Sequence, residues 1–148
     1  MKKIKIGRND SVVIANGKYD RLSEVPEGHI DYDKWINFIN LHKDYFIWYE
    51  DTPNGVNAKE NIDKVSDWAR ERVLYLINKT NAYSTDKIVK NPSDFIVKFD
   101  KVSNCIWISI EKKMTKEIAE ILLEMANFLD GKVIINGDKL LESIEQLE

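Results

Sequence analysis

The chain has few of the residues on which disulfide-linked, membrane-spanning or multi-domain proteins depend. Its 148 residues include a single cysteine, so no internal disulfide can form, as is usual in a reducing cytoplasm. Only three prolines and six glycines leave little room for flexible linkers. No apolar run reaches the length of a signal peptide or of a membrane span, which is about eighteen residues. We therefore expect one cytoplasmic domain over residues 1–148, with no membrane contact.

An excess of basic charge is also absent. The 22 Lys and Arg residues are outnumbered by 25 Asp and Glu residues, which gives a net charge of −3 at pH 7. Because nucleic-acid-binding domains usually carry a basic patch or stripe, no nucleic-acid partner is expected. Residues 111–148 hold five Lys and nine Asp or Glu residues, a net charge of −4. An acidic segment of this kind is suited to a basic partner.

Residues that commonly carry catalysis are equally few. Cys105 is the only thiol, and His29 and His42 are the only imidazoles. A nucleophilic cysteine needs a base beside it, whereas Cys105 lies in an alternating strand pattern that favours a small buried residue. Neither a zinc-binding spacing nor a glycine-rich phosphate loop is present. The sequence therefore favours a binding protein over an enzyme, with no catalytic residue, metal site or cofactor.

Hydrophobic periodicity predicts an α+β fold, a mainly antiparallel sheet packed with about three helices. The clearest pattern is an antiparallel hairpin over 95–100 and 105–110, in which apolar residues alternate. Asn-Gly dipeptides at 16–17 and 136–137 predict tight turns. Helices are predicted at 32–42, 57–80 and 116–129, the second capped by Asn57 and broken near Ser66. Further strands are predicted at 2–6, 11–15, 18–22, 45–49, 132–135 and 139–141, and 81–94 has the least regular pattern.

The aromatic segment 45–49 (Tyr-Phe-Ile-Trp-Tyr) is a predicted strand with two apolar faces. It therefore lies centrally in the sheet or forms the wall of a pocket. We expect Phe46 and Trp48 to be buried beneath a helix, since an exposed aromatic strip is an aggregation liability. The alternative is a small-molecule site lined by Phe46, Trp48 and Trp107, with Glu50 as its polar group. Glu50 is otherwise part of the turn before Pro53.

The predicted helix at 116–129 has the most distinct faces. Thr115 is suited to its N-cap, and Gly131 is expected to end it. At 100° per residue, Glu117, Glu120 and Glu124 fall within about 60° of one another. They are either a solvated face or an acidic docking ridge for a basic partner. A separate arc should face the core and contains Ile118, Ile121, Leu122, Met125 and Leu129.

Two regions of the chain carry a resemblance to known proteins. The aromatic segment runs into Glu50-Asp51-Thr52-Pro53 and a capped helix, and the chain ends with the helix to Leu129, Gly131, a strand and Asn136-Gly137-Asp138. In this order of elements the chain resembles the small α+β immunity proteins with which bacteria neutralise polymorphic toxins. The resemblance implies a protein partner, often a nuclease or another toxin domain, and defines no catalytic residues.

Three functions follow from these patterns. The preferred hypothesis is a non-catalytic protein-binding module, immunity-protein-like, that docks a basic partner through Glu117, Glu120 and Glu124. The second is a small-molecule-binding domain or small enzyme with the aromatic pocket near Glu50. The third is a homodimeric structural protein that associates through exposed aromatic residues.

Overall fold

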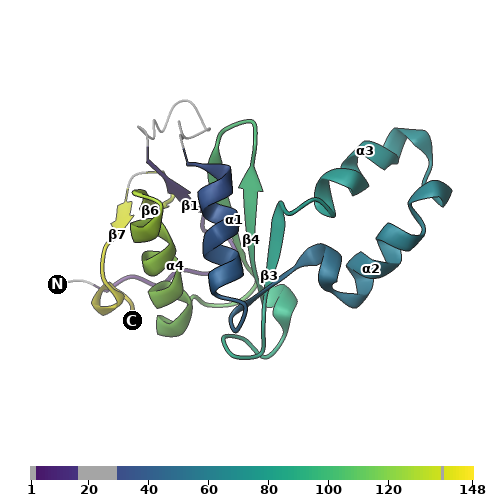
Figure 1. Cartoon of the computed structure of the whole chain (residues 1–148). Coiled ribbons are helices and arrows are strands. Elements are labelled where there is room, and N and C mark those ends of the chain that lie inside the picture. The colour runs from purple at the N-terminus through teal and green to yellow at the C-terminus, as the bar shows by residue number, and fades with distance from the viewer. Residues whose placement is uncertain (1–2, 17–29, 138) are drawn as a thin grey trace.

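The computed structural model describes residues 3–16, 30–137 and 139–148. In these residues the chain forms four α-helices and one seven-stranded antiparallel sheet, which confirms the predicted α+β class with one more helix than expected (Figure 1). None of the described helices combines the length and the apolar character that a membrane span needs. The helices are α1 (Tyr32–Leu41), α2 (Pro53–Glu60), α3 (Asp67–Leu76) and α4 (Lys116–Phe128). The strands are β1 (Val12–Ala15), β2 (Phe46–Trp48), β3 (Asn81–Ser84), β4 (Phe95–Asp100), β5 (Cys105–Ile110), β6 (Lys132–Ile135) and β7 (Lys139–Leu141).

The sheet has the strand order β2-β3-β4-β5-β1-β6-β7. The predicted β4–β5 hairpin is confirmed, with register pairs from Phe95–Ile110 to Asp100–Cys105. The 136–137 turn is also confirmed, because β6 pairs with β7 and both turn residues have positive φ angles. The irregular segment 81–94 contains the short β3, a turn at 86–88 and a 3₁₀ turn at Pro92–Asp94.

The N-terminal segment does not form the expected strand. Ile4 makes a single parallel bridge with Leu147. The next predicted strand, at 11–15, does form: it is β1, which lies between β5 and β6. All four residues of β1 are buried, so this strand requires neighbours on both edges and cover on both faces. Lys3 and Lys5 are exposed and could not occupy such a place. The expected turn at 16–17 and strand at 18–22 fall outside the described residues, apart from Asn16.

The aromatic strand β2 lies at the edge of the sheet, so the central position, one of the two alternatives predicted for it, is wrong. Its burial comes from α1: the Trp35 and Trp48 rings meet edge to face at 5.4 Å, and the Trp48 indole N–H donates to Asn40. The prediction that Phe46 and Trp48 are buried beneath a helix is confirmed. Cover by α1 on one face is thus enough to bury the Phe46 and Trp48 side chains, although β2 has a neighbouring strand on one edge only.

Helices α2 and α3 form an arm that projects from one edge of the sheet (Figure 1). Helix α2 begins four residues before the predicted start, because Thr52 is the N-cap and accepts the Gly55 N–H, with Pro53 at the first helical position. Asn57, the predicted cap, lies inside this helix. The predicted break near Ser66 is confirmed, since α3 begins directly after it.

Helices α1 and α4 lie side by side on one face of the sheet and cover the main core (Figure 1). Thr115 caps α4 as predicted and accepts the Ile118 N–H at 3.2 Å. The helix ends through Asp130, which has a φ of 54°, while the Gly131 N–H donates to the Ala126 carbonyl at 2.8 Å. Gly131 is needed for close packing rather than for a positive φ, because a Cβ there would lie 3.2 Å from both Ile14 and Ile30.

Candidate functional site: an acidic groove along α4

The outward side of α4 carries the three predicted glutamates. Glu117, Glu120 and Glu124 are exposed, whereas the opposite side of the helix is buried in the core. The helical spacing therefore separates an acidic face from an apolar face, as the sequence predicts. The buried side consists of Ile118, Ala119, Ile121, Leu122, Met125 and Ala126.

The three glutamates form one wall of a groove with a volume of about 380 Å³. The opposite wall comes from Tyr45, which precedes β2, and from the turn that follows β3. The Thr85 N–H donates to the Tyr45 carbonyl at 2.9 Å, which holds the two segments together. We call this feature the acidic groove, and it is lined by Tyr45, Lys87, Ile88, Glu117, Glu120, Ile121 and Glu124.

Most of the negative charge in the acidic groove is not neutralised by neighbouring side chains. Among the described residues Lys87 is the one cation that lines it, and its ammonium lies 3.8 Å from the Asp44 carboxylate and 5.7 Å from the centre of the Tyr45 ring. Within the described part of the chain, neither Glu117 nor Glu120 has an ion-pair partner within 4 Å. The acidic groove therefore has a net negative charge beside an apolar floor.

His42, at the C-terminal end of α1, contacts Glu124, one of the residues that line the groove. Its Nε2 lies 3.1 Å from Glu124 Oε1, and its Nδ1 lies 2.7 Å from the Phe38 carbonyl oxygen. The sequence pattern did not assign His42 to the site. The only local signal is the Phe38–His42 spacing at a helix end, since Glu124 is 82 residues away in the chain.

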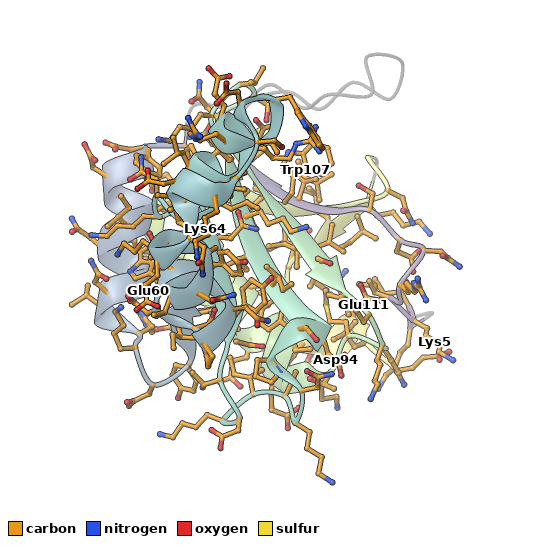
Figure 2. The ribbon with its side chains drawn as sticks, turned by 90° about the vertical axis from the view of Figure 1, so that its right-hand side faces the viewer. Lys5, Glu60, Lys64, Asp94, Trp107 and Glu111 are labelled. Carbon is orange, nitrogen blue, oxygen red and sulfur yellow. The ribbon has the colours of Figure 1, made fainter. Side chains whose placement is uncertain are left out.

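The residues of the alternative aromatic pocket are not brought together. Phe46 and Trp48 face the core beneath α1. Trp107 lies on the other face of the sheet, because the residue paired through β3, β4 and β5 with Trp48 is Ile108. Figure 2 shows Trp107 on the side of the sheet away from α1. There it contacts a small separate cluster of Val13, Ala15, Cys105 and Ile134.

Glu50 has a structural position at the base of the arm. It is 7% exposed, and its Oε2 accepts the N–H of Lys79 at 2.8 Å. Lys79 has a φ of 54°, so this hydrogen bond fixes a turn in the left-handed region. Burial, followed by the charge of Glu50, raises the pKa of the nearby Tyr32 hydroxyl. Glu50 therefore joins the two ends of the arm where they meet the sheet.

Cys105 is fully buried in β5, as its strand pattern predicts. Burial raises the pKa of its thiol, which opposes formation of the reactive thiolate. The thiol donates to the Ser103 carbonyl at 3.3 Å. His42 lies at the acidic groove, and His29 is outside the described residues. These observations support a packing role for Cys105.

Metal-binding groups do not gather at any place in the described ranges, where no three His, Cys, Asp or Glu residues could hold an ion. Comparison with known proteins finds no matching family model, curated protein or solved structure. The class of the chain therefore comes from its helices and sheet, which make it an α+β protein.

Proposed function

We propose that the chain is a non-catalytic protein-binding module whose acidic groove holds a basic segment of a partner protein. The observation that carries this proposal is the placement of Glu117, Glu120 and Glu124 along one groove of about 380 Å³ with an apolar floor. A solvated helix face needs no opposite wall, whereas a binding site does.

The chemistry of the acidic groove fits lysine or arginine side chains. These residues have apolar stems and charged ends, and they bury the stem while the charge finds a polar partner. Ile88 and Ile121 offer contacts for the stems. The carboxylates of α4 would then pair with the charged ends. The groove is too polar along α4 to favour a purely apolar segment.

The resemblance to bacterial immunity proteins supports the same class of partner. A nuclease domain must attract a polyanionic substrate, so its substrate-binding surface is basic. An acidic groove of this kind could cover part of such a surface and exclude the substrate. We therefore propose an immunity-like role with a basic toxin domain as partner.

The test compares wild type with the triple variant Glu117→Lys, Glu120→Lys and Glu124→Lys. A partner recovered from the native host would be purified, and its association rate would be measured at several salt concentrations. We expect the variant to associate at least about tenfold more slowly at low salt and to lose the salt dependence, because complementary charge chiefly accelerates association.

The matched control is Glu60→Lys, Glu71→Lys and Glu142→Lys, which makes the same change in net charge at exposed positions elsewhere. A triple Glu→Gln variant of the α4 residues removes charge without placing lysine near the positive end of the helix. Equal low-salt association rates for wild type and the α4 variants would contradict the proposal. The three glutamates would then be a solvated helix face with no role in binding.

Self-association is the second candidate function, and one observation favours it. Trp68 on α3 is 84% exposed, an unusual position for the residue type most enriched at the centres of interfaces. None of the residues of α3 is buried. A homodimer formed through the arm would cover this side chain. The aromatic-pocket hypothesis has no comparable support, because Phe46, Trp48 and Trp107 do not share a cavity.

A further inference from the structure

The imidazole of His42 is held in one orientation at the edge of the acidic groove. Its ring is stacked on Phe38, with centroids 4.0 Å apart and an angle of 22° between the planes. Its side chain is 18% exposed. Nδ1 lies 2.7 Å from the Phe38 carbonyl oxygen, which can only accept a hydrogen bond, so Nδ1 must carry a proton.

The other ring nitrogen also faces an acceptor. Nε2 lies 3.1 Å from Oε1 of Glu124, and an ionised carboxylate can only accept. A neutral imidazole has one N–H and can satisfy only one of these two contacts. Beside an ionised Glu124, only the doubly protonated, positively charged ring satisfies both contacts. The last turn of a helix favours such a charge, because its carbonyl groups form the negative end of the helix dipole.

We propose that His42 is a positioning residue of the acidic groove, which pairs with Glu124 when protonated and releases that carboxylate to a basic partner when neutral. This inference rests on the proposed function of the groove. Protonation changes the charge of a histidine side chain, so the affinity for a basic segment should change with pH.

The direction of the change follows from the hydrogen bonds. At low pH the imidazolium neutralises Glu124, and a cation from a partner must compete with it. At higher pH the neutral ring keeps its Nδ1 proton on the Phe38 carbonyl and presents a lone pair to the carboxylate. Two acceptors repel each other, so Glu124 turns to the groove and binding of a cation is strengthened.

The other charged groups around His42 leave this assignment intact. Glu117 and Glu120 line the groove from α4, and Lys87 is already beside Asp44. Lys43, the next residue in the chain, lies over the Trp48 ring and 4.0 Å from Asp51. The Tyr45 ring lies 6.4 Å from the imidazole. Glu124 is thus the one carboxylate within hydrogen-bonding distance of the His42 ring among the described residues.

The experiment uses a synthetic end-capped peptide, Lys-Leu-Lys-Leu-Lys, whose charge is constant between pH 5.5 and 8 because lysine titrates near pH ~10.4. Its affinity is measured by calorimetry at both pH values. We expect wild type to bind about two- to fivefold more tightly at pH 8, the effect of one partly exposed ion pair. His42→Gln should abolish this pH dependence, and Glu124→Gln should reduce it, since the imidazolium still repels the lysines of the peptide at low pH. The matched control Glu120→Gln should bind more weakly but keep it.

A second measurement does not depend on the peptide. In the free protein, nitrogen NMR of the ring should show both His42 nitrogens protonated at low pH and only Nδ1 protonated once the ring is neutral. A neutral ring protonated on Nε2 would overturn the inference, as would an unchanged pH dependence in Glu124→Gln. If the peptide binds with no pH dependence, the proposed role of His42 is wrong and the proposed function stands. If the peptide does not bind at any pH, both the role of His42 and the proposed function are wrong.

Discussion

Asp10 connects the N-terminal segment with the turn between β6 and β7. Its Oδ2 accepts the Gly7 N–H at 2.8 Å, and its Oδ1 accepts from the Asn136 side chain at 3.0 Å. Asn136 also accepts the N–H of Ser11 at 2.8 Å. The Asn136 hydrogen bond, followed by that of Gly7, lowers the pKa of the Asp10 carboxyl below its ordinary value. The charged carboxylate is therefore the form that the fold stabilises.

This shift predicts how acid affects the protein. A carboxyl with a lowered pKa in the folded state contributes stability that is fully present above the unfolded-state pKa of about 3.9, and it loses that stability as the pH falls through the folded value. The free energy of unfolding of wild type should therefore fall more steeply than that of Asp10→Asn below about pH 4. Urea denaturation at a series of pH values measures both curves. Asp86→Asn, at an exposed position, is the control, and parallel curves for wild type and Asp10→Asn would contradict the prediction.

At the scale of elements, the arm is joined to the sheet by a few polar contacts around Lys79. Glu50 accepts its N–H, and the Tyr32 hydroxyl donates to its carbonyl at 2.8 Å. Tyr75 at the end of α3 donates to the Phe99 carbonyl, also at 2.8 Å. Since no residue of α3 is buried, these contacts substitute for a packed interface.

Removal of the Glu50 side chain should loosen the arm. Glu50→Ala removes the acceptor of the Lys79 N–H, which costs about 0.5 to 1.5 kcal/mol, the usual net contribution of a hydrogen bond. Hydrogen exchange followed by mass spectrometry should then show faster exchange of residues 53–77 than in wild type, with the β4–β5 hairpin unchanged. Glu50→Gln keeps a carbonyl acceptor and should have a smaller effect. Uniform acceleration across the chain would instead mean that Glu50 supports the whole fold.

At the scale of the whole molecule, the arm is the part of the chain through which we propose self-association. Residues 53–77 contain four acidic and four basic side chains, so two copies of the arm could approach without net repulsion. Trp68 and Arg72 are one turn apart on α3, which would allow the indole of one copy to face the guanidinium of the other in a two-fold arrangement.

We expect the sedimentation coefficient of wild type to rise with concentration, and we expect Trp68→Ala to weaken the self-association at least about 30-fold, the effect of truncating an interface hot spot. Leu41→Ala removes another exposed apolar side chain, 71% exposed at the end of α1, and should leave association unchanged. A single concentration-independent species for wild type would exclude the homodimer and leave Trp68 for a different partner.

Local patterns in the sequence were sufficient for the elements whose partners are close in the chain. The β4–β5 hairpin and helix α4 were predicted at nearly their observed bounds, because alternation, helical spacing and the Thr115 cap depend on neighbouring residues. The separation of the three glutamates from the buried side of α4 follows from the same spacing. The early start of α2 was missed because Thr52-Pro53 is compatible with both a turn and a helix start.

The neighbours of each element were decided only by the tertiary structure. The four buried residues of β1 are compatible with any pair of apolar strands, and the packing of the whole sheet selects β5 and β6. Likewise, Trp48 and Trp107 share an aromatic character in the sequence, but the strand register places them on opposite faces. The sequence determined that α4 has an acidic face. The fold placed Tyr45, Lys87 and His42 beside that face, because contacts between distant segments depend on how the complete core packs and not on local pattern.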